Sequence, residues 1–271
     1  METLCALCDS VVNKFLFLGL LETRSEGVRM PLHEVIRNLK GYINFLKESD
    51  FILLEEKKRR TSPAEKQASH TSPKSHPTEM ASRVEALKKV ADSIAACTSC
   101  RLSLGRIHTV PGDGHPLTRV VFVGEAPGYH EDQQGLPFVG RAGKLLERLL
   151  AGIGLMRQEV FICNVMKCRP PENREPLPDE ILACEPYLLK QLDILKPLVI
   201  CALGRLATHI LLRTNAGINT LRGRFFPYHG ILLMPTLHPA ALLRNPIQLP
   251  DVERDFKLLS AKLKEITGQN V

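Results

Sequence analysis

The sequence predicts an α/β domain that follows a region of different composition. Four short runs of β-branched and aliphatic residues lie at 119–124, 159–165, 197–203 and 230–235, and amphipathic segments separate them. Continuous apolar runs of this kind are typical of strands buried on both faces of a parallel sheet. A chain of 271 residues with 44% hydrophobic content can also bury a sizeable core. The predicted fold class is therefore α/β with a parallel sheet of four strands.

The part of the chain before this domain divides in two. Apolar residues recur at three- and four-residue steps over 31–49, which predicts an amphipathic helix within an N-terminal extension of residues 1–54. Residues 55–80 are rich in Ser, Thr, Pro, Lys and His and hold no large aliphatic residue before Met80. Such a segment cannot drive a core, so we predict a disordered linker there. The α/β domain then occupies residues 81–271.

The helices of the domain are predicted from apolar residues spaced three and four positions apart. The first of them runs straight into Cys97, so it ends where a cysteine motif begins. The four apolar faces are Val84, Leu87, Val90 and Ile94; Leu145, Leu146, Leu149, Leu150 and Ile153; Ile181, Leu188, Leu192 and Leu195; and Val252, Phe256, Leu259, Leu263 and Ile266.

Four cysteines have a pattern that predicts a metal centre. Cys97 and Cys100 form a C-x-x-C pair, and Cys168 and Cys184 follow far along the chain. Zinc ribbons and fingers normally carry a second short-spaced pair after the first, and no C-x-x-C pair follows Cys100. An iron-sulfur cluster held by four thiolates is therefore favoured over zinc. The other cysteines are predicted not to bind metal: Cys5, Cys8, Cys163 and Cys201.

The net charge and the N-terminal sequence indicate the kind of partner and the cellular compartment. The net charge of +7 and the pI near 9.0 favour a polyanionic partner such as nucleic acid. The first residues include Glu2 and Asp9 and lack the basic region and cleavage site of a secretory signal. The apolar run at 15–21 is too short to span a bilayer. We therefore expect a cytoplasmic protein in a reducing compartment, with no membrane partner.

Polar side chains follow the predicted strands, where open α/β sheets bind ligands. The first strand leads into a glycine-rich loop, residues 124–143, which contains Glu125, Glu131 and Asp132. This loop matches neither the P-loop nor the dinucleotide-binding pattern. Asn164 lies at the end of the second strand, and its amide offers both a donor and an acceptor. His238 follows the fourth strand and precedes a proline.

Four segments together resemble the family 4 uracil-DNA glycosylases, which are iron-sulfur members of a wider superfamily. The segments are GEAPGYHEDQQGLPFVGRAG, NVMKCRPPENREP, ACEPYL and HPAALLRNP, and they occur in the family's order. The resemblance covers residues 85–266. It implies a three-layer domain with a central parallel sheet flanked by helices, which flips uracil out of DNA and excises it.

The resemblance also implies roles for residues that would contact the base. Phe138 would stack on the flipped uracil, and Asn164 would read its O4 and N3 edge and reject cytosine. Gly124 and Ala126 would lie beside the base. Superfamily members with a GQDPY motif carry an aspartate where this chain has Ala126, so the water-activating role of that aspartate is not transferred to this position.

Further roles concern the chemistry. His238 would donate a hydrogen bond to the uracil O2, where negative charge develops in the transition state. A carboxylate would orient the attacking water and stabilise the sugar cation, with Glu125 expected first, Glu131 second and Asp132 third.

The same resemblance indicates residues that would contact DNA, and a cofactor. Leu242 and Leu243 would enter the base stack and Arg244 would grip phosphate, although both leucines could instead complete the core. Arg169 and Arg174 are further candidates for phosphate contact. The cofactor would be a structural 4Fe-4S cluster on the cysteine quartet, and the protein is expected to act as a monomer on single- or double-stranded DNA.

Two other classes of function remain compatible with the sequence. A binding module could hold uracil-containing or single-stranded DNA without efficient turnover. A zinc-stabilised α/β hydrolase could instead act on nucleotides, and visible absorbance with iron content would distinguish it from the other two.

Overall fold

The computed structural model describes residues 77–268, so the predicted helix over 31–49 lies outside the described residues. The first described helix, α4, spans Pro77–Ala95. Residues 77–80, which we assigned to the linker, are therefore helical, and the linker prediction is corrected at this boundary. Proline is tolerated in the first turn of a helix, and Glu79 pairs with Arg83 one turn later at 2.8 Å.

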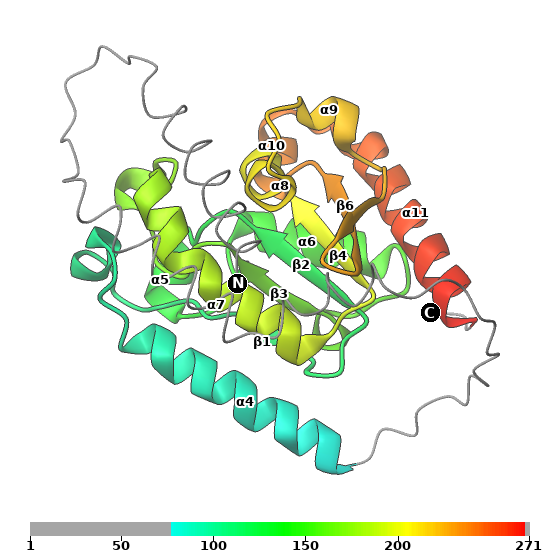
Figure 1. The fold of residues 1–271 in the computed structure, drawn as a ribbon. Coiled ribbons are helices and arrows are strands. Elements are labelled where there is room, and N and C mark those ends of the chain that lie inside the picture. Colours follow the sequence, from blue (N-terminus) through cyan, green and yellow to red (C-terminus); the bar gives the residue numbers. More distant parts are fainter. Residues whose placement is uncertain (1–76, 269–271) are drawn as a thin grey trace, which may run out of the picture. The chain divides into compact units, whose positions relative to one another are not determined.

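A six-stranded sheet forms the centre of the domain (Figure 1). Its spatial order is β1-β3-β2-β4-β6-β5; the four central strands run parallel, and each edge strand is antiparallel to its neighbour. The central four confirm the predicted parallel sheet. The edge strands were not predicted because they are too short to show a period. The strands are β1 Asp113–Gly114, β2 Val120–Gly124, β3 Phe161–Asn164, β4 Val199–Leu203, β5 Phe226–Tyr228 and β6 Ile231–Thr236.

Both faces of the sheet are buried under helices, which gives the predicted three layers (Figure 1). Alternate residues of β2 point to opposite faces: Val120 and Phe122 join one hydrophobic cluster, and Val121 and Val123 join the other. Helices α6 and α11 cover the first face, and α7 and α8 cover the second. Their bounds are α6 Arg141–Ala151, α7 Pro178–Leu195, α8 Arg205–Leu212 and α11 Leu249–Thr267.

Helix α4 packs along the outside of α7 (Figure 1). Arg83 fixes this contact by donating a 2.6 Å hydrogen bond to the carbonyl of Leu195 at the end of α7. Val84 belongs to the predicted apolar face of α4 but is 48% exposed, so that face is narrower than predicted. The short elements are η1 Arg101–Leu104, α5 Tyr129–Gln134, η2 Arg157–Glu159, η3 Pro171–Asn173, α9 Ile218–Leu221, α10 Pro239–Arg244 and η4 Pro246–Gln248.

The strand order creates a switch point between β2 and β4. From β2 the chain crosses to β3 on one side, and it then returns to β4 on the other. Ligands of open α/β sheets bind beyond the carboxyl ends of the strands at such a point. The described helices include none long and apolar enough to cross a membrane. The six described cysteines are free thiols.

Candidate active site

Asn164 ends β3 beside the carboxyl end of β2, and its side chain carries an unpaired polar atom. The residue is 2% exposed. Its Oδ1 is the one buried side-chain nitrogen or oxygen in residues 77–268 that lacks a hydrogen-bond partner. Leaving a buried acceptor unpaired costs about 1–3 kcal/mol, so such atoms usually have a functional explanation. Asn164 is therefore prepared to accept a hydrogen bond from a ligand.

Gly124, the last residue of β2, is the point on which two predicted site residues converge. A Cβ atom at this position would lie 2.3 Å from Asn164 Oδ1 and 2.8 Å from Cζ of Phe138. Any side chain larger than hydrogen would therefore displace both groups. The structure thus brings together Gly124, Phe138 and Asn164, which the sequence placed on three separate segments.

Phe138 has an unusual backbone conformation for a residue with a side chain. Its φ is +52°, a region that costs of order 1–3 kcal/mol and persists only when the surroundings enforce it. Arg157 supplies part of that constraint by donating hydrogen bonds to the carbonyls of Pro137 (2.6 Å) and Phe138 (3.3 Å). The residue is 5% exposed and belongs to the first core cluster, and its ring stacks on His238, with centroids 5.5 Å apart and planes at 27°.

Glu131 supplies the rest of the constraint. Its Oε1 accepts hydrogen bonds from the N–H groups of Val139 (3.0 Å) and Gly140 (3.1 Å), and its Oε2 accepts one from Gly128 (3.1 Å). These hydrogen bonds connect the two ends of the loop that contains Phe138, so both oxygens of the Glu131 carboxylate already have backbone N–H partners. Asp132 is also engaged, because it is 2% exposed and its Oδ1 accepts a backbone N–H at 3.0 Å. Both residues are thus better placed to hold the loop than to orient water.

His238 precedes α10, and its ring has a defined protonation state. Its Nδ1 accepts a hydrogen bond from the N–H of Ala240 at 3.1 Å, so in the neutral ring the proton is on Nε2. Burial, followed by the charge of Arg244, lowers the pKa of His238 to about 4. At neutral pH the ring is therefore an uncharged donor through Nε2. Gly204, at φ +92°, allows this approach, since a Cβ there would lie 2.8 Å from that of His238.

Glu125 follows β2 directly and is the remaining carboxylate of the loop. Burial, and secondarily the nearby Glu175, raises the pKa of Glu125, while Arg205 opposes the shift. A carboxylate with a raised pKa is a better proton acceptor. Ala126, the next residue, packs against the second core cluster and offers no polar side-chain atom. Glu125 thus remains the candidate among these carboxylates for orienting a water molecule.

The two leucines predicted to contact DNA lie in α10 and differ in burial. Leu242 is 2% exposed and belongs to the first core cluster, so its side chain completes the core. Leu243 is only partly buried against the same cluster, and Arg244 is exposed. The structure therefore favours Leu243 and Arg244 over Leu242 as the groups that reach a partner.

The two arginines near Cys168 also differ. Arg174 binds the fully buried carboxylate of Glu180 through two hydrogen bonds, of 2.9 and 2.6 Å, which indicates a structural role. Arg169 lies over the ring of Tyr129, 5.3 Å from its centroid, and donates to Asn173 at 2.8 Å. Arg169 thus remains the candidate for phosphate contact.

The four predicted metal-binding cysteines line a single cavity. Cys97 and Cys100 come from the segment between α4 and η1, Cys168 from the loop after β3, and Cys184 from the first half of α7. Cys163 and Cys201 lie in β3 and β4, are fully buried and do not line this cavity. No group of three or more His, Cys, Asp or Glu side chains within residues 77–268 is gathered closely enough to hold a metal ion.

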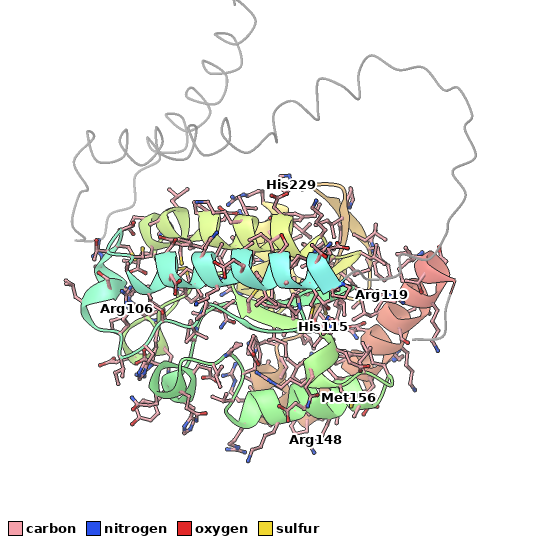
Figure 2. All side chains as sticks on the ribbon, turned by 90° about the horizontal axis from the view of Figure 1, so that it is seen from below. Arg106, His115, Arg119, Arg148, Met156 and His229 are labelled. Carbon is pink, nitrogen blue, oxygen red and sulfur yellow. The ribbon has the colours of Figure 1, made fainter. Side chains whose placement is uncertain are left out.

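Three of the four sulfur atoms already receive hydrogen bonds. Cys97 Sγ accepts from the N–H of Ser99 (3.5 Å), Cys184 Sγ from the N–H of Lys167 (3.2 Å), and Cys168 Sγ from Nη1 of Arg106 (3.3 Å). Arg106 also binds the last carbonyl of α4 at 2.9 Å, and Figure 2 shows it beside that end of the helix. Donors aimed at sulfur stabilise thiolates, which is the form that metals require.

The thiols differ in acidity in the described structure. Burial raises the pKa of Cys184 to about 12 and also raises those of Cys100 and Cys168. Burial also acts on Cys97, but hydrogen bonds from Ser99 and Tyr187 outweigh it, and its pKa is lowered.

Lys167 is a buried cation between this cavity and Asn164. The residue is 1% exposed, and its Nζ donates to the carbonyl of Asn164 and to Oε1 of Gln191, both at 2.7 Å. Within residues 77–268 it forms no ion pair with a carboxylate. Buried charges are normally paired or next to a metal centre, so an anionic group in the adjacent cavity would compensate this ammonium. The sequence offered no signal for this role beyond the position of Lys167 next to Cys168.

Comparison with known proteins identifies the family. The model of the uracil-DNA glycosylase superfamily matches residues 111–264. The type-4 uracil-DNA glycosylase of Sulfurisphaera tokodaii is 43% identical over 192 residues, which cover 68% of this chain and 86% of that protein. The chain belongs to the type-4 uracil-DNA glycosylases. Those of Saccharolobus solfataricus and Thermotoga maritima are each 45% identical, over 90% and 95% of their lengths and 68% and 65% of this chain.

Membership in the type-4 family confirms the resemblance that the four segments predicted. The superfamily match contains Gly124, Asn164 and His238 together with Cys168 and Cys184. The C-x-x-C pair that shares the cavity with these two cysteines precedes the matched residues.

Proposed function

We propose that this type-4 family member excises uracil from DNA by hydrolysing the bond between the base and its deoxyribose, leaving an abasic site. The observation that carries the proposal is the unpaired, buried Oδ1 of Asn164, which lies beside Phe138. The names of the relatives support the same activity. A module that only binds DNA would not need the neutral donor of His238, whose ring stacks on Phe138.

Base recognition rests on complementary hydrogen bonds. Asn164 Oδ1 accepts from N3–H of uracil, while its amide N–H donates to O4. Cytosine reverses both, because its N3 is an acceptor and its N4 a donor, so a buried amide would face two unpaired contacts. Phe138 stacks on the flipped base, and flipping itself costs a few kcal/mol, least in single strands or mismatches.

Bond cleavage places negative charge on uracil and positive charge on the sugar. The Nε2–H of His238 stabilises the charge at O2, and an uncharged donor does so without leaving a buried cation in the free protein. Glu125 orients a water molecule toward the sugar, accepts its proton and stabilises the sugar cation. Leu243 occupies the gap left by the flipped base, and Arg244 binds an adjacent phosphate.

The four thiolates of the cavity, Cys97, Cys100, Cys168 and Cys184, would hold a 4Fe-4S cluster. The hydrogen bonds to sulfur and the unpaired ammonium of Lys167 fit an anionic group at this place. Through these cysteines, the segment after α4, the loop after β3 and α7 would be tied together by a bound cluster, whose role would be structural because the proposed reaction moves no electrons.

The proposal is tested with a single-stranded oligonucleotide that carries one uracil, with thymine and cytosine strands as controls. Alkali then cuts the strand wherever a base has been lost. His238→Ala should slow excision by about 10²–10³-fold, the usual effect of losing such a donor, with DNA binding retained. Asn164→Asp should weaken discrimination against cytosine. Unchanged rates and selectivity in both variants would remove these residues from the site.

A further inference from the structure

An exposed aromatic side chain lies at the same edge of the sheet as the proposed active site. Tyr129 begins α5, after the loop that leaves β2, and it is 54% exposed. Arg169 comes from the loop that leaves β3, the parallel neighbour of β2. Its guanidinium carbon lies 5.3 Å from the centroid of the Tyr129 ring. The loop that contains Glu125 and the loop that follows Asn164 thus also supply Tyr129, which is exposed, and Arg169, which is half-buried.

The structure fixes Arg169 and leaves its charge uncompensated. Its Nε donates to Oδ1 of Asn173 at 2.8 Å. Glu172 and Asn173 adopt φ of +54° and +56°, a conformation that few residues other than glycine accept. In the described part of the chain, Arg169 forms no ion pair with a carboxylate. It differs in this from Arg174, which binds Glu180 in the same loop region.

The Tyr129 ring, although Arg169 lies over it, belongs to a residue that is 54% exposed and is therefore accessible to a ligand. His130 meets it at 78°, with centroids 5.5 Å apart, so within residues 77–268 no aromatic ring stacks parallel to it. Proteins that hold single-stranded nucleic acid combine an exposed aromatic, on which a base stacks, with a cation that binds the backbone. Tyr129 and Arg169 supply these two elements.

We propose that Tyr129 and Arg169 form a platform for the unpaired strand beside the flipped uracil. The phenol ring stacks on a neighbouring base, and the guanidinium binds a phosphate of the same strand. In a duplex that base is already stacked and paired, so the platform acts mainly on single strands. The inference rests on the proposed function, because the flipped uracil defines which strand segment lies nearby.

The test measures binding of a single-stranded oligonucleotide that carries thymine in place of uracil, so that affinity is read without excision. Tyr129→Ala should weaken binding at least about fivefold, with a smaller loss on the matching duplex. Tyr129→Phe keeps the ring and should retain most of the affinity. Equal binding by wild type and Tyr129→Ala, or equal losses on both forms of DNA, would overturn the platform.

Salt dependence tests the phosphate contact. Arg169→Gln should reduce the slope of log affinity against log salt by about 0.7, the value for one contact on a single strand. Lys88→Gln removes one charge from the exposed surface of α4 and serves as the matched control, with an unchanged slope. An unchanged slope in Arg169→Gln would contradict the proposal. Failure of the wild type to excise uracil would be a separate result, since it concerns the active site.

Discussion

Replacing Asn164 with leucine should separate stability from function. The wild-type protein holds an unpaired Oδ1 in a side chain that is 2% exposed. Such an atom costs about 1–3 kcal/mol, and leucine has a similar shape without a polar group. Asn164→Leu should therefore be at least as stable as the wild type. For a domain of this size, each 1 kcal/mol corresponds to a rise in Tm of roughly 2–4 °C.

The same substitution should abolish recognition of the base. Two hydrogen bonds to uracil are lost, each worth roughly 1–3 kcal/mol in a buried site, so excision should fall by about 10²-fold or more. Free uracil should raise the Tm of the wild type by binding the folded state but leave that of Asn164→Leu unchanged. Asn164→Asp is the matched control, because it retains a buried acceptor and should gain no stability.

Thermal unfolding and single-turnover excision, measured on the same preparations, test this reasoning. A marked fall in Tm for Asn164→Leu would show that the amide stabilises the free protein. Excision close to the wild-type rate would show that Asn164 does not read the base. Either result would refute the argument from the unpaired Oδ1.

Three further predictions concern the groups around this amide. Arg157→Gln removes the two hydrogen bonds from Arg157 to the carbonyls of Pro137 and Phe138, which help to hold Phe138 at positive φ, so kcat/KM should fall by about tenfold or more. Arg157→Lys should recover part of this loss. Full activity in Arg157→Gln would show that these hydrogen bonds are dispensable. Lys167→Met removes the donor to two buried acceptors, so the free energy of unfolding should drop by about 1–3 kcal/mol for each. Loss of the cation should also make the reduction potential of the bound cluster more negative, whereas Lys88→Gln, the control, should not change it. An unchanged potential in Lys167→Met would contradict a cluster beside Lys167. Because the folded pKa of His238 is depressed to about 4, the stability that its neutral ring contributes should be complete above pH 6.5 and be lost as pH falls toward 4; a stability profile identical to that of His238→Gln would rule this out.

The sequence predicted the central sheet and its helices because each buried strand and each amphipathic helix carries its own period. The edge strands β1 and β5 were missed because two or three residues cannot show one. The start of α4 was placed too late because its first residues are polar. Local patterns therefore gave the elements that build the core but not the limits of the short or polar ones.

The candidate site was predictable where residue type carries the chemistry. The cysteine quartet was indicated by a C-x-x-C pair and two further cysteines, and Asn164 and His238 were indicated by their positions at the ends of predicted strands. The hydrogen bonds from Arg157 to the Phe138 segment and the burial of Lys167 were not predictable, since both depend on contacts between segments distant in sequence. The roles of Glu131 and Leu242 were ambiguous for the same reason. Only the fold shows which carboxylate is held by backbone N–H groups and which leucine enters the core.

Identification of the released product tests the central claim most directly. Wild-type protein should convert a single-stranded oligonucleotide with one uracil into free uracil base and an intact strand that breaks only after alkali. The thymine strand should release nothing, and His238→Ala should release uracil far more slowly. An iron-containing preparation that binds the same strand but releases no uracil would contradict the account.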